Sequence, residues 1–369
     1  MRFQSRRFPS VNRARDEALE ASVLEEVGAG DPPAAPRLAV IISCYNYERY
    51  VREAIDSVLQ QQRDDCELVV VDDGSKDQSW AVITASGVRA VRLRNLGQIG
   101  ACRVGLSRTT APFVLFLDAD DILKPGALET IIGLLDDEVA KLQFSLSRVG
   151  ADGEYLGEAL PSLRAFRDRA ALQESVFSTG TYTSPPTSGN VFRRDLCAVL
   201  AEVDYDTALD GVILFMAPFF GDVVSLTDEL GSYRIHGGNY SAQGQRPQKL
   251  VMERDIERFA RRTEHLRGIL DDLGVAAKMV PTDRMYFYIE RRICANLAGD
   301  LRPGMGEVWR AFAAAKHLSW SAKTRVAMTA FYLMAAVLPL RRAQNLMAYR
   351  FTYGQRSVRG MISAMLLRS

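Results

Sequence analysis

The segment from Phe113 to Leu123, with the sequence FVLFLDADDIL, limits the possible folds more than any other part of the chain. Five apolar residues are followed at once by the carboxylates of Asp118, Asp120 and Asp121. The apolar run has the length of a buried strand and is too short for a helix. Acids at the end of a buried strand destabilise a fold unless a cation balances them, and open α/β sheets bind ligands at this end of their strands. We therefore expect a divalent metal and a phosphate-bearing ligand at the edge of a parallel sheet.

Strand-sized apolar runs alternate with helical patterns along the first third of the chain. Strands are expected at residues 38–43, 67–71, 90–93 and 113–117. Helices are expected at residues 51–62, 77–85 and 97–109. This alternation is typical of right-handed crossovers between parallel strands, so the chain is expected to have an α/β fold.

The pattern differs before Leu38 and after Pro125. Residues 16–27 have a helical pattern and residues 28–36 (GAGDPPAAP) form a linker, so the ordered fold is expected to begin at Leu38. After Pro125 we expect helices at 126–135 and 208–220, a hairpin of 141–148 with 154–156, strands at 190–192, 223–226 and 232–235, and helices from 248 onward.

Charge is unevenly distributed, although the whole chain carries a net charge of only +1. Residues 301–369 contain eleven Lys and Arg against one acid, Glu307, which leaves a net charge of about −9 for the remainder. A mainly acidic remainder argues against a nucleic-acid-binding protein. The basic C-terminal segment requires a different explanation.

The five cysteines are scattered, with no CxxC spacing and an odd total. This usage suits a reducing compartment and neither a disulfide framework nor a zinc site. No apolar run follows the N-terminal arginines, so no signal peptide is expected. The apolar run at residues 326–340 is fifteen residues long, short of the ~20 residues that a spanning helix needs.

A second pair of acids, Asp72 and Asp73, follows the expected strand at residues 67–71. One such group can be a helix cap, because aspartate often begins helices. Two groups on one edge of a parallel sheet favour a binding site. A few carboxylates suit Mg²⁺ or Mn²⁺, which complete their shells with waters and substrate phosphates. No Walker lysine motif and no GxGxxG follow the first strand, which disfavours a P-loop NTPase and a dinucleotide enzyme.

The order of four segments resembles a family 2 glycosyltransferase with the GT-A fold. The segments read LAVIISCYNYERYVREAIDSVLQQ, ELVVVDDGSKDQS, RNLGQIGACRVGLS and APFVLFLDADDILKPGALE. The resemblance covers roughly residues 38–241, over half of the chain. An isolated DxD would be weak evidence, whereas this ordered set is specific.

The resemblance implies a nucleotide site. Tyr45 matches the aromatic residue that stacks on the donor base, and Asp73 matches the acid that accepts a hydrogen bond from that base. The family's usual Arg-Asn pair is replaced by Cys102 and Arg103, although Arg103 can still reach the diphosphate. The expected nucleotide-binding residues are Ser43, Tyr45, Asn46, Asp72, Asp73, Asn95, Gln98, Arg103 and Asp118.

The resemblance also implies a metal site for Mg²⁺ or Mn²⁺. Asp118 and Asp120 match the DxD motif, with Asp120 the direct ligand and Asp121 in support. His236 lies in a YRIHG stretch that resembles the end of the family's domain, where it would contact the metal or the diphosphate. Arg234 of the same stretch would pair with phosphate.

The acceptor's proton requires a base, for which Asp210 is the candidate. The family often has Glu-Asp on a helix after a segment such as TSGNVFRRD (residues 187–195), and this chain has Leu209-Asp210 there. Because Leu209 departs from the pattern, Asp206 remains a rival. Asp210 can instead interact with a helix dipole. Residues 187–190 are expected to shape the sugar pocket.

Cations flank the apolar run at residues 326–340 and continue after it. This is the pattern of a helix that lies in an anionic membrane interface, or of a helical domain whose apolar face packs on the core. We expect a cytoplasmic protein, peripheral at the cytoplasmic membrane through residues 316–369, with a glycan or lipid-linked acceptor and no nucleic-acid partner.

These expectations together describe a metal-dependent, inverting glycosyltransferase that uses a nucleoside-diphosphate sugar. The alternatives are a non-catalytic nucleotide-sugar-binding scaffold and, less favoured, a nucleotidyltransferase. The expected parts are an extension at 1–36, a GT-A domain at 37–244 with a nucleotide-binding half (37–123) and an acceptor-binding half (124–244), and a basic helical region at 245–369.

Overall fold

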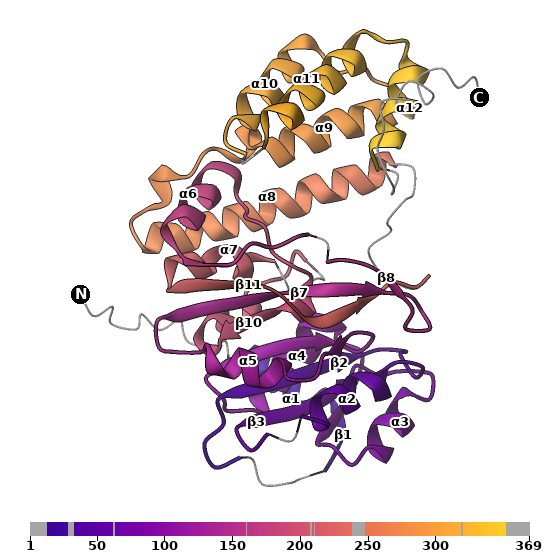
Figure 1. The fold of residues 1–369 in the computed structure, drawn as a ribbon, viewed down its shortest axis with the longest axis vertical. Helices are drawn as coiled ribbons and strands as arrows, with labels where there is room; N and C mark the ends of the chain where they lie inside the picture. The colour runs from indigo at the N-terminus through magenta and orange to yellow at the C-terminus, as the bar shows by residue number, and fades with distance from the viewer. Residues whose placement is uncertain are drawn as a thin grey trace. The chain divides into compact units, whose positions relative to one another are not determined.

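A mixed β-sheet forms the core of one of the two units into which the chain divides (Figure 1). The computed structural model describes residues 13–28, 33–61, 63–159, 161–206, 209, 211–237, 248–318 and 320–351. The first unit contains residues 1–171 and 183–237, and the second contains residues 172–182 and 238–369.

Four parallel strands form the first half of the sheet, in the order β4, β3, β2, β5. They are β2 (Leu38–Cys44), β3 (Cys66–Asp72), β4 (Ala90–Leu93) and β5 (Phe113–Asp118). Every residue from Leu38 to Ile42 is fully buried, as expected for a parallel strand that is covered on both faces. The four strands predicted from the apolar runs are confirmed.

Helices connect these strands and cover the sheet. They are α2 (Val51–Leu59), α3 (Ser79–Ala85), α4 (Gly97–Ser107) and, after β5, α5 (Ala127–Gly133). The apolar face of α2, with Ile55 and Val58, packs into the core beside the strands. A Cβ atom at Gly105 of α4 would lie 2.3 Å from Ile41 Cγ2, so glycine permits the close approach of α4 to β2.

The second half of the sheet is mixed. β10 (Asn190–Arg193) pairs antiparallel with β5 and with β7 (Val139–Val149), and β7 pairs parallel with β11 (Asp222–Arg234). The hairpin predicted after residue 141 is confirmed as the antiparallel pair of β7 and β8. The strands are β6 (Ile122–Leu123), β7 (Val139–Val149), β8 (Tyr155–Gly157), β9 (Phe166–Asp168), β10 (Asn190–Arg193) and β11 (Asp222–Arg234). Short 3-10 helices lie at Thr187–Gly189 and Arg194–Ala201.

Two expectations for this half were wrong in detail. Residues 223–226 and 232–234 belong to a single strand, β11, because the residues between them stay extended and the pairing with β7 shifts register on both sides of Glu229. Ile235 lies just after this strand. The expected helix at 208–220 is limited, among the described residues, to α7 (Val212–Met216) and a 3-10 helix (Ala217–Phe219). Pro218 has no N–H to continue an α-helix.

The segment before Leu38 also differs from its expected helix and linker. It contains α1 (Arg13–Glu20) and a further strand, β1 (Val23–Val27), which pairs antiparallel with β4 at the edge of the sheet. Glu26 pairs with Arg89 and Arg108, and Glu25 accepts a hydrogen bond from Trp80. These partners lie more than fifty positions away in the sequence, so the helical pattern of residues 16–27 did not reveal the strand.

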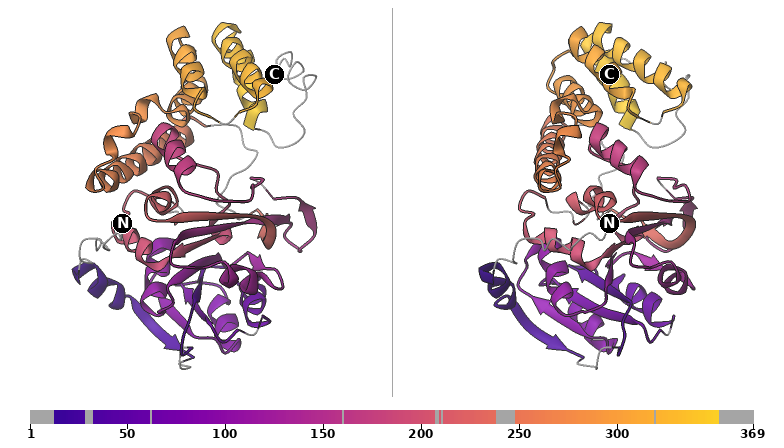
Figure 2. Two further views of the ribbon diagram at one scale, coloured as in Figure 1. Left: turned by 60° about the vertical axis from the view of Figure 1, so that its left-hand side comes forward. Right: turned by 90° about the vertical axis from the view of Figure 1, so that its left-hand side faces the viewer.

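Helices form the second unit (Figures 1 and 2). Its core contains the buried side chains of Ile293, Leu297, Phe331 and Leu346, which come from three of its helices. No helix in the described ranges, which end at residue 351, is both long and apolar enough to cross a membrane. The helices are α6 (Ala170–Thr179, mostly in this unit), α8 (Lys249–Asp272), α9 (Tyr286–Ala298), α10 (Met305–Ala315), α11 (Ala322–Val337) and α12 (Leu340–Phe351), with 3-10 turns at Ala276–Lys278 and Thr282–Arg284.

Candidate functional site

The carboxyl ends of β2, β3 and β5 meet at one edge of the sheet. Ser43 at the end of β2 lies opposite Asp118 on β5, and Cys44 lies opposite Asp72 on β3. The two acidic strand ends are therefore neighbours of the same loop, which begins at Tyr45. This is the arrangement that parallel pairing predicts.

Side chains hold the carboxylates of Asp118 and Asp120. Gln98 Nε2, in the first turn of α4, donates a hydrogen bond of 2.7 Å to Asp118 Oδ1. His236 Nε2 lies 3.0 Å from Asp120 Oδ2, within hydrogen-bond distance. Asp120 is 6% exposed, so its carboxylate lies in a largely enclosed position next to the imidazole.

Asp121 is the most deeply buried acid of the group. Its Oδ2 accepts a hydrogen bond of 2.6 Å from the Ser188 hydroxyl, and its Oδ1 accepts one of 3.0 Å from the Arg234 backbone N–H. Burial, followed by the charges of Asp120 and Asp118, raises the pKa of Asp121 well above its ordinary value. Ser188 Oγ also accepts a hydrogen bond from the Asp118 N–H, which ties the end of β5 to the 3-10 helix at 187–189.

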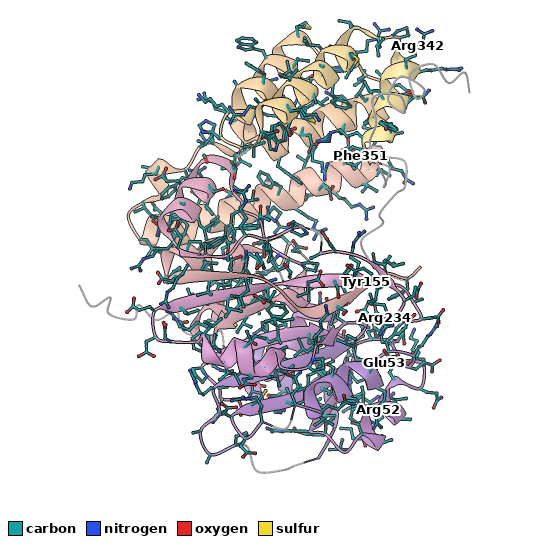
Figure 3. The ribbon with its side chains drawn as sticks, viewed as in Figure 1. Arg52, Glu53, Tyr155, Arg234, Arg342 and Phe351 are labelled. Carbon is teal, nitrogen blue, oxygen red and sulfur yellow. The ribbon has the colours of Figure 1, made fainter. Side chains whose placement is uncertain are left out.

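Arg234 is engaged within the protein, which differs from its expected role as a phosphate partner. Its guanidinium donates to Glu53 Oε2 (2.6 Å), the Asp120 carbonyl (2.9 Å) and the Ala151 carbonyl (3.2 Å), and it lies over the Tyr50 ring. Figure 3 labels Arg234 and Glu53. Because Arg234 is 2% exposed, it clamps the loop after β5 rather than facing a ligand.

Two tyrosines fix the orientation of the His236 ring. The Tyr50 ring lies 5.0 Å from it at an angle of 32°, and the Tyr47 ring lies 5.9 Å from it at 81°. Both tyrosines come from the segment that leads into α2. The imidazole is therefore in contact with two aromatic rings and with the Asp120 carboxylate.

The acids at the end of β3 bind mainly to backbone. Asp73 Oδ1 accepts from the Leu96 N–H (2.6 Å) and Oδ2 accepts from the Gly97 N–H (2.8 Å), which satisfies amides at the start of α4. Asp72 Oδ2 accepts from the Ser75 N–H and lies 3.4 Å from Arg92 Nε. Burial raises the pKa of both carboxyls.

Tyr45 and Asn46 occupy the loop after β2. The Tyr45 side chain is exposed (39%), as a ring that stacks on a base would need to be. Asn46 has a φ of 60°, and its side-chain carbonyl accepts a hydrogen bond of 2.8 Å from the Lys76 N–H. Asn46 thus joins this loop to the one after β3, a role that the sequence pattern did not reveal.

The remaining expected nucleotide residues lie around α4. Asn95 is exposed just before the helix, and Arg103 is half-buried on it. Cys102, which replaces a polar residue of the family pattern, is fully buried. Of the residues expected on α4, Gln98 reaches the acids at the sheet edge, through its hydrogen bond to Asp118.

A buried polar network in the second half of the sheet was missed. Lys141 Nζ donates to Gln143 Oε1 (2.8 Å) and Ser184 Oγ (2.9 Å), and the Ser184 hydroxyl donates to Asn190 Oδ1 (2.9 Å). Asn190 Nδ2 in turn donates to the Pro186 carbonyl (2.8 Å). The polar residues at every second position of β7 were the available signal, since alternate residues share one face of a strand.

The predicted base, Asp210, lies outside the described residues. Its neighbour Leu209 is described and is 1% exposed. The rival Asp206 is described and half-buried. The described site therefore does not include the side chain of the predicted catalytic base.

The carboxylates fit a divalent ion of the type that binds substrate phosphates. The described residues contain no group of three or more His, Cys, Asp or Glu side chains arranged to hold a metal. Mg²⁺ and Mn²⁺ do not require one, because one or two carboxylates, waters and phosphate oxygens complete their shells. Asp118 and Asp120 at the end of β5 are donors of this kind.

Comparison with known proteins gives consistent matches. Residues 39–183 match the model described as glycosyl transferase family 2. A protein of Nostoc sp. named as an uncharacterized glycosyltransferase is 31% identical over 287 residues, covering 74% of this chain and 86% of the relative. A Haemophilus influenzae protein with the same description is 32% identical over 260 residues, covering 66% and 78%.

A solved structure shows the same fold. The crystal structure of S. aureus TarS 1-349 in complex with UDP-GlcNAc is 17% identical, with a TM-score of 0.50. The match covers 86% of this chain and 93% of that chain. The likeness establishes the GT-A fold, with its mixed central sheet and helical C-terminal region.

Proposed function

The chain belongs to glycosyltransferase family 2, and we propose that it is a metal-dependent, inverting enzyme that transfers a sugar from a nucleoside-diphosphate sugar to an acceptor hydroxyl. The observation that carries the proposal is the position of Asp118 at the end of β5, opposite Ser43, with Asp120 two residues after the strand. The side chains of Gln98 and His236 orient these carboxylates.

Asp118 and Asp120 would hold Mg²⁺ or Mn²⁺, with His236 as a further candidate ligand or as the group that orients Asp120. When bound, such an ion neutralises the charge on the departing diphosphate as a Lewis acid. Gln98 fixes Asp118 through a charge-assisted hydrogen bond, and Asp121 fixes the loop through Ser188 and Arg234.

We assign nucleotide recognition to the loops after β2 and β3. The exposed ring of Tyr45 can stack on the base, while Asn46 holds the two loops together. Asp73 can accept a further hydrogen bond from the base, because each of its oxygens has a second lone pair besides the one used at α4. Asp72, Asn95 and Arg103 complete the proposed nucleotide site.

We propose Asp210 as the base, with Asp206 as its rival. In a single displacement the acceptor oxygen attacks the anomeric carbon, its proton passes to the carboxylate, and the bond to the diphosphate oxygen breaks. The configuration of the anomeric carbon then inverts. The proposal rests on the position of Asp210 after the 187–195 segment.

We further propose a glycan or lipid-linked acceptor and a location at the cytoplasmic face of a membrane. The support is the excess of cations in residues 301–369, where eleven Lys and Arg accompany one acid. Cations attract a protein to anionic lipid surfaces.

A binding protein without turnover is the second candidate. It is favoured by Leu209, which is apolar and buried where the family pattern has an acid. Donor hydrolysis separates the two, because a scaffold binds the donor without consuming it.

The test is a thermal-shift panel of nucleoside diphosphates and nucleotide sugars with and without Mn²⁺, followed by a hydrolysis assay with the donor that stabilises the protein most. The enzyme is expected to show metal-dependent stabilisation and slow release of nucleoside diphosphate. Stabilisation without any hydrolysis, with or without candidate acceptors, would favour the scaffold. No stabilisation by any nucleotide would contradict both.

A further inference from the structure

Helix α11 in the second unit is apolar on its solvent side as well as on its core side. Phe331 and Tyr332 are buried in the core. Val326, Leu333 and Val337 are exposed by 70%, 42% and 67%, and their spacing of seven and four residues puts them on one face. A helix of a soluble domain normally has charged residues on that face, so these residues need an explanation.

Helix α10 exposes a second apolar stripe. Met305, Trp309 and Phe312 are exposed by 57%, 69% and 47%, at spacings of four and three residues. The Trp309 and Phe312 rings contact each other, with centroids 5.6 Å apart. Val308 and Ala311 on the opposite side of the helix pack into the core.

Cations lie between the two stripes in the sequence and at both ends of the α11 stripe. Lys316, Lys323 and Arg325 lie in the exposed connection between α10 and α11 and at the start of α11, and Arg341 and Arg342 follow α11. No acidic residue occurs after Glu307. An apolar stripe with cations at both ends complements an anionic membrane interface.

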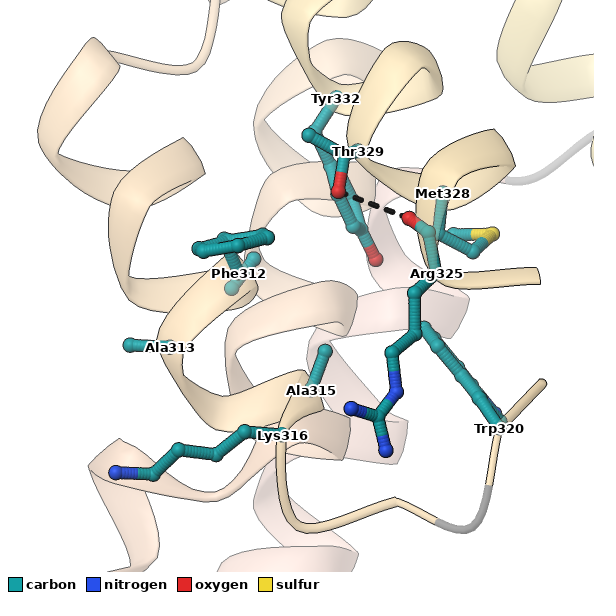
Figure 4. Close-up of a pocket in the computed structure, with 10 residues that line it drawn as sticks. Phe312, Ala313, Ala315, Lys316, Trp320, Arg325, Met328, Thr329 and Tyr332 are labelled. Carbon is teal, nitrogen blue, oxygen red and sulfur yellow. Dashed lines mark hydrogen bonds between the residues drawn. The ribbon is translucent and has the colours of Figure 1, made fainter. Parts of the chain in front are cut away.

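A cavity of about 120 Å³ lies between α10 and α11 (Figure 4). Its walls include Phe312, Met328 and Tyr332, and Lys316 and Arg325 also line it. An apolar cavity of roughly 150 Å³ can hold a benzene ring, so this one has room for the end of an acyl chain. The two cations can then pair with a lipid phosphate.

We propose that Met305, Trp309, Phe312, Val326, Leu333 and Val337 form a docking face for an anionic phospholipid membrane, with the end of an acyl chain in the adjoining cavity. The proposal deepens the membrane attachment proposed above. A second copy of the chain is a poorer occupant, because pairing two copies of this face would bring their cations together. Transfer chemistry at the sheet edge is not required for docking.

The test is flotation of the full chain with phosphatidylcholine vesicles, with and without phosphatidylglycerol. We expect flotation only with phosphatidylglycerol. Val337→Glu and the double variant Arg341→Glu/Arg342→Glu should each lower partitioning by about tenfold or more, because they place negative charge on the face or remove its cations. The matched controls on α8, Leu250→Glu (71% exposed) and Arg254→Glu/Arg261→Glu, should partition like the wild type.

Tryptophan fluorescence locates the contact. Vesicles of phosphatidylglycerol with brominated acyl chains should quench the wild-type fluorescence, and Trp309→Phe should lose a large part of this quenching. Trp320, which lines the cavity, should account for the remaining quenching, and Trp320→Phe measures that share. Trp80, which is bound to Glu25 in the first unit, should contribute none.

Three results would overturn the proposal. They are the absence of flotation with anionic vesicles, equal losses in the face and control variants, and quenching that is unchanged by the Trp309 and Trp320 substitutions. Loss of a dimer in the Val337→Glu variant, together with no flotation of the wild type, would assign the face to a second copy. Donor hydrolysis in solution is measured for every variant, so failure of the enzymatic proposal is distinguished from failure of docking.

Discussion

The ends of β3 and β5 both carry neighbouring carboxylates, but the groups that bind these carboxylates differ in kind. Asp73 after β3 accepts hydrogen bonds from backbone amides of α4, which cannot leave without opening the first turn of that helix. Asp118 and Asp120 on and after β5 contact the side chains of Gln98 and His236, and a ligand can replace such side-chain contacts without opening the backbone. Acids at one sheet edge can thus divide into those that hold the fold and those that can exchange their contacts for a ligand.

The largest effect is expected at Asp120. Asp120→Ala should lower donor turnover by about a thousandfold or more, because a metal contributes several kcal/mol to the transition state and 1.36 kcal/mol corresponds to a factor of ten. The measurement is nucleoside-diphosphate release at saturating donor and Mn²⁺. Asp152→Ala removes an exposed acid and serves as the control. Turnover retained in Asp120→Ala would show that the acids at β5 do not hold a catalytic metal.

A smaller loss is expected at Gln98. Gln98→Ala removes the hydrogen bond to Asp118 and should lower kcat by about 10- to 100-fold, since a hydrogen bond to a charged group contributes roughly 1.5–3 kcal/mol. Thermal stability should change little. Gln78→Ala, at an exposed glutamine before α3, is the matched control. An equal loss in both variants would mean that Gln98 does not act through Asp118.

Substitution of Asp73 at the end of β3 should lower the stability of the fold, and not only the rate of catalysis. Asp73→Asn replaces one acceptor oxygen with a donor facing a backbone N–H and should lower the free energy of unfolding by about 1–3 kcal/mol. Urea unfolding of this variant and of Asp118→Asn gives the comparison. A larger destabilisation in Asp118→Asn would contradict the assignment of Asp73 to the fold and of Asp118 to ligand binding.

The smallest expected effect is a change in how the free energy of unfolding depends on pH. Burial is the main cause that raises the folded-state pKa of Asp73 above its ordinary value of 3.8, so its contribution to stability is complete below pH 3.8 and is lost as pH rises through the folded-state pKa. Asp73→Asn lacks this titration. The difference in unfolding free energy between the wild type and the variant should therefore shrink as pH rises, which urea unfolding at several pH values measures. A difference that grows as pH rises would contradict the raised pKa of Asp73.

Local sequence patterns predicted the parts of the fold that depend on short segments. The apolar runs at β2, β3, β4 and β5 read as buried strands because consecutive Val, Ile and Leu residues have few other stable environments. The acids that follow them mark the ends of the strands. The edge that contains Asp72 and Asp118 was predictable for the same reason, since parallel strands have their carboxyl ends on one side.

Features that depend on distant partners were not predictable from one sequence. The sequence pattern predicts that Arg234 binds phosphate, yet its guanidinium donates hydrogen bonds to Glu53 and to two carbonyls of separate loops. Lys141 lies fully buried beside Gln143 of its own strand and Ser184 of a segment about forty positions away. In both cases the sequence shows a cation, whereas only the packing shows which groups satisfy it.

The strand β1 has a consequence for any shortened form of this protein. It covers the outer edge of β4, and a chain that began at Leu38 would leave the backbone amides of β4 open to pairing with another molecule. The same deletion would remove Glu26 from Arg89 and Arg108. In the described part of the chain the outermost strand on this side is β1, which carries two adjacent glutamates, Glu25 and Glu26, and such charges discourage further strands from joining the sheet. We therefore expect a protein shortened to begin at Leu38 to aggregate more readily than one that keeps β1.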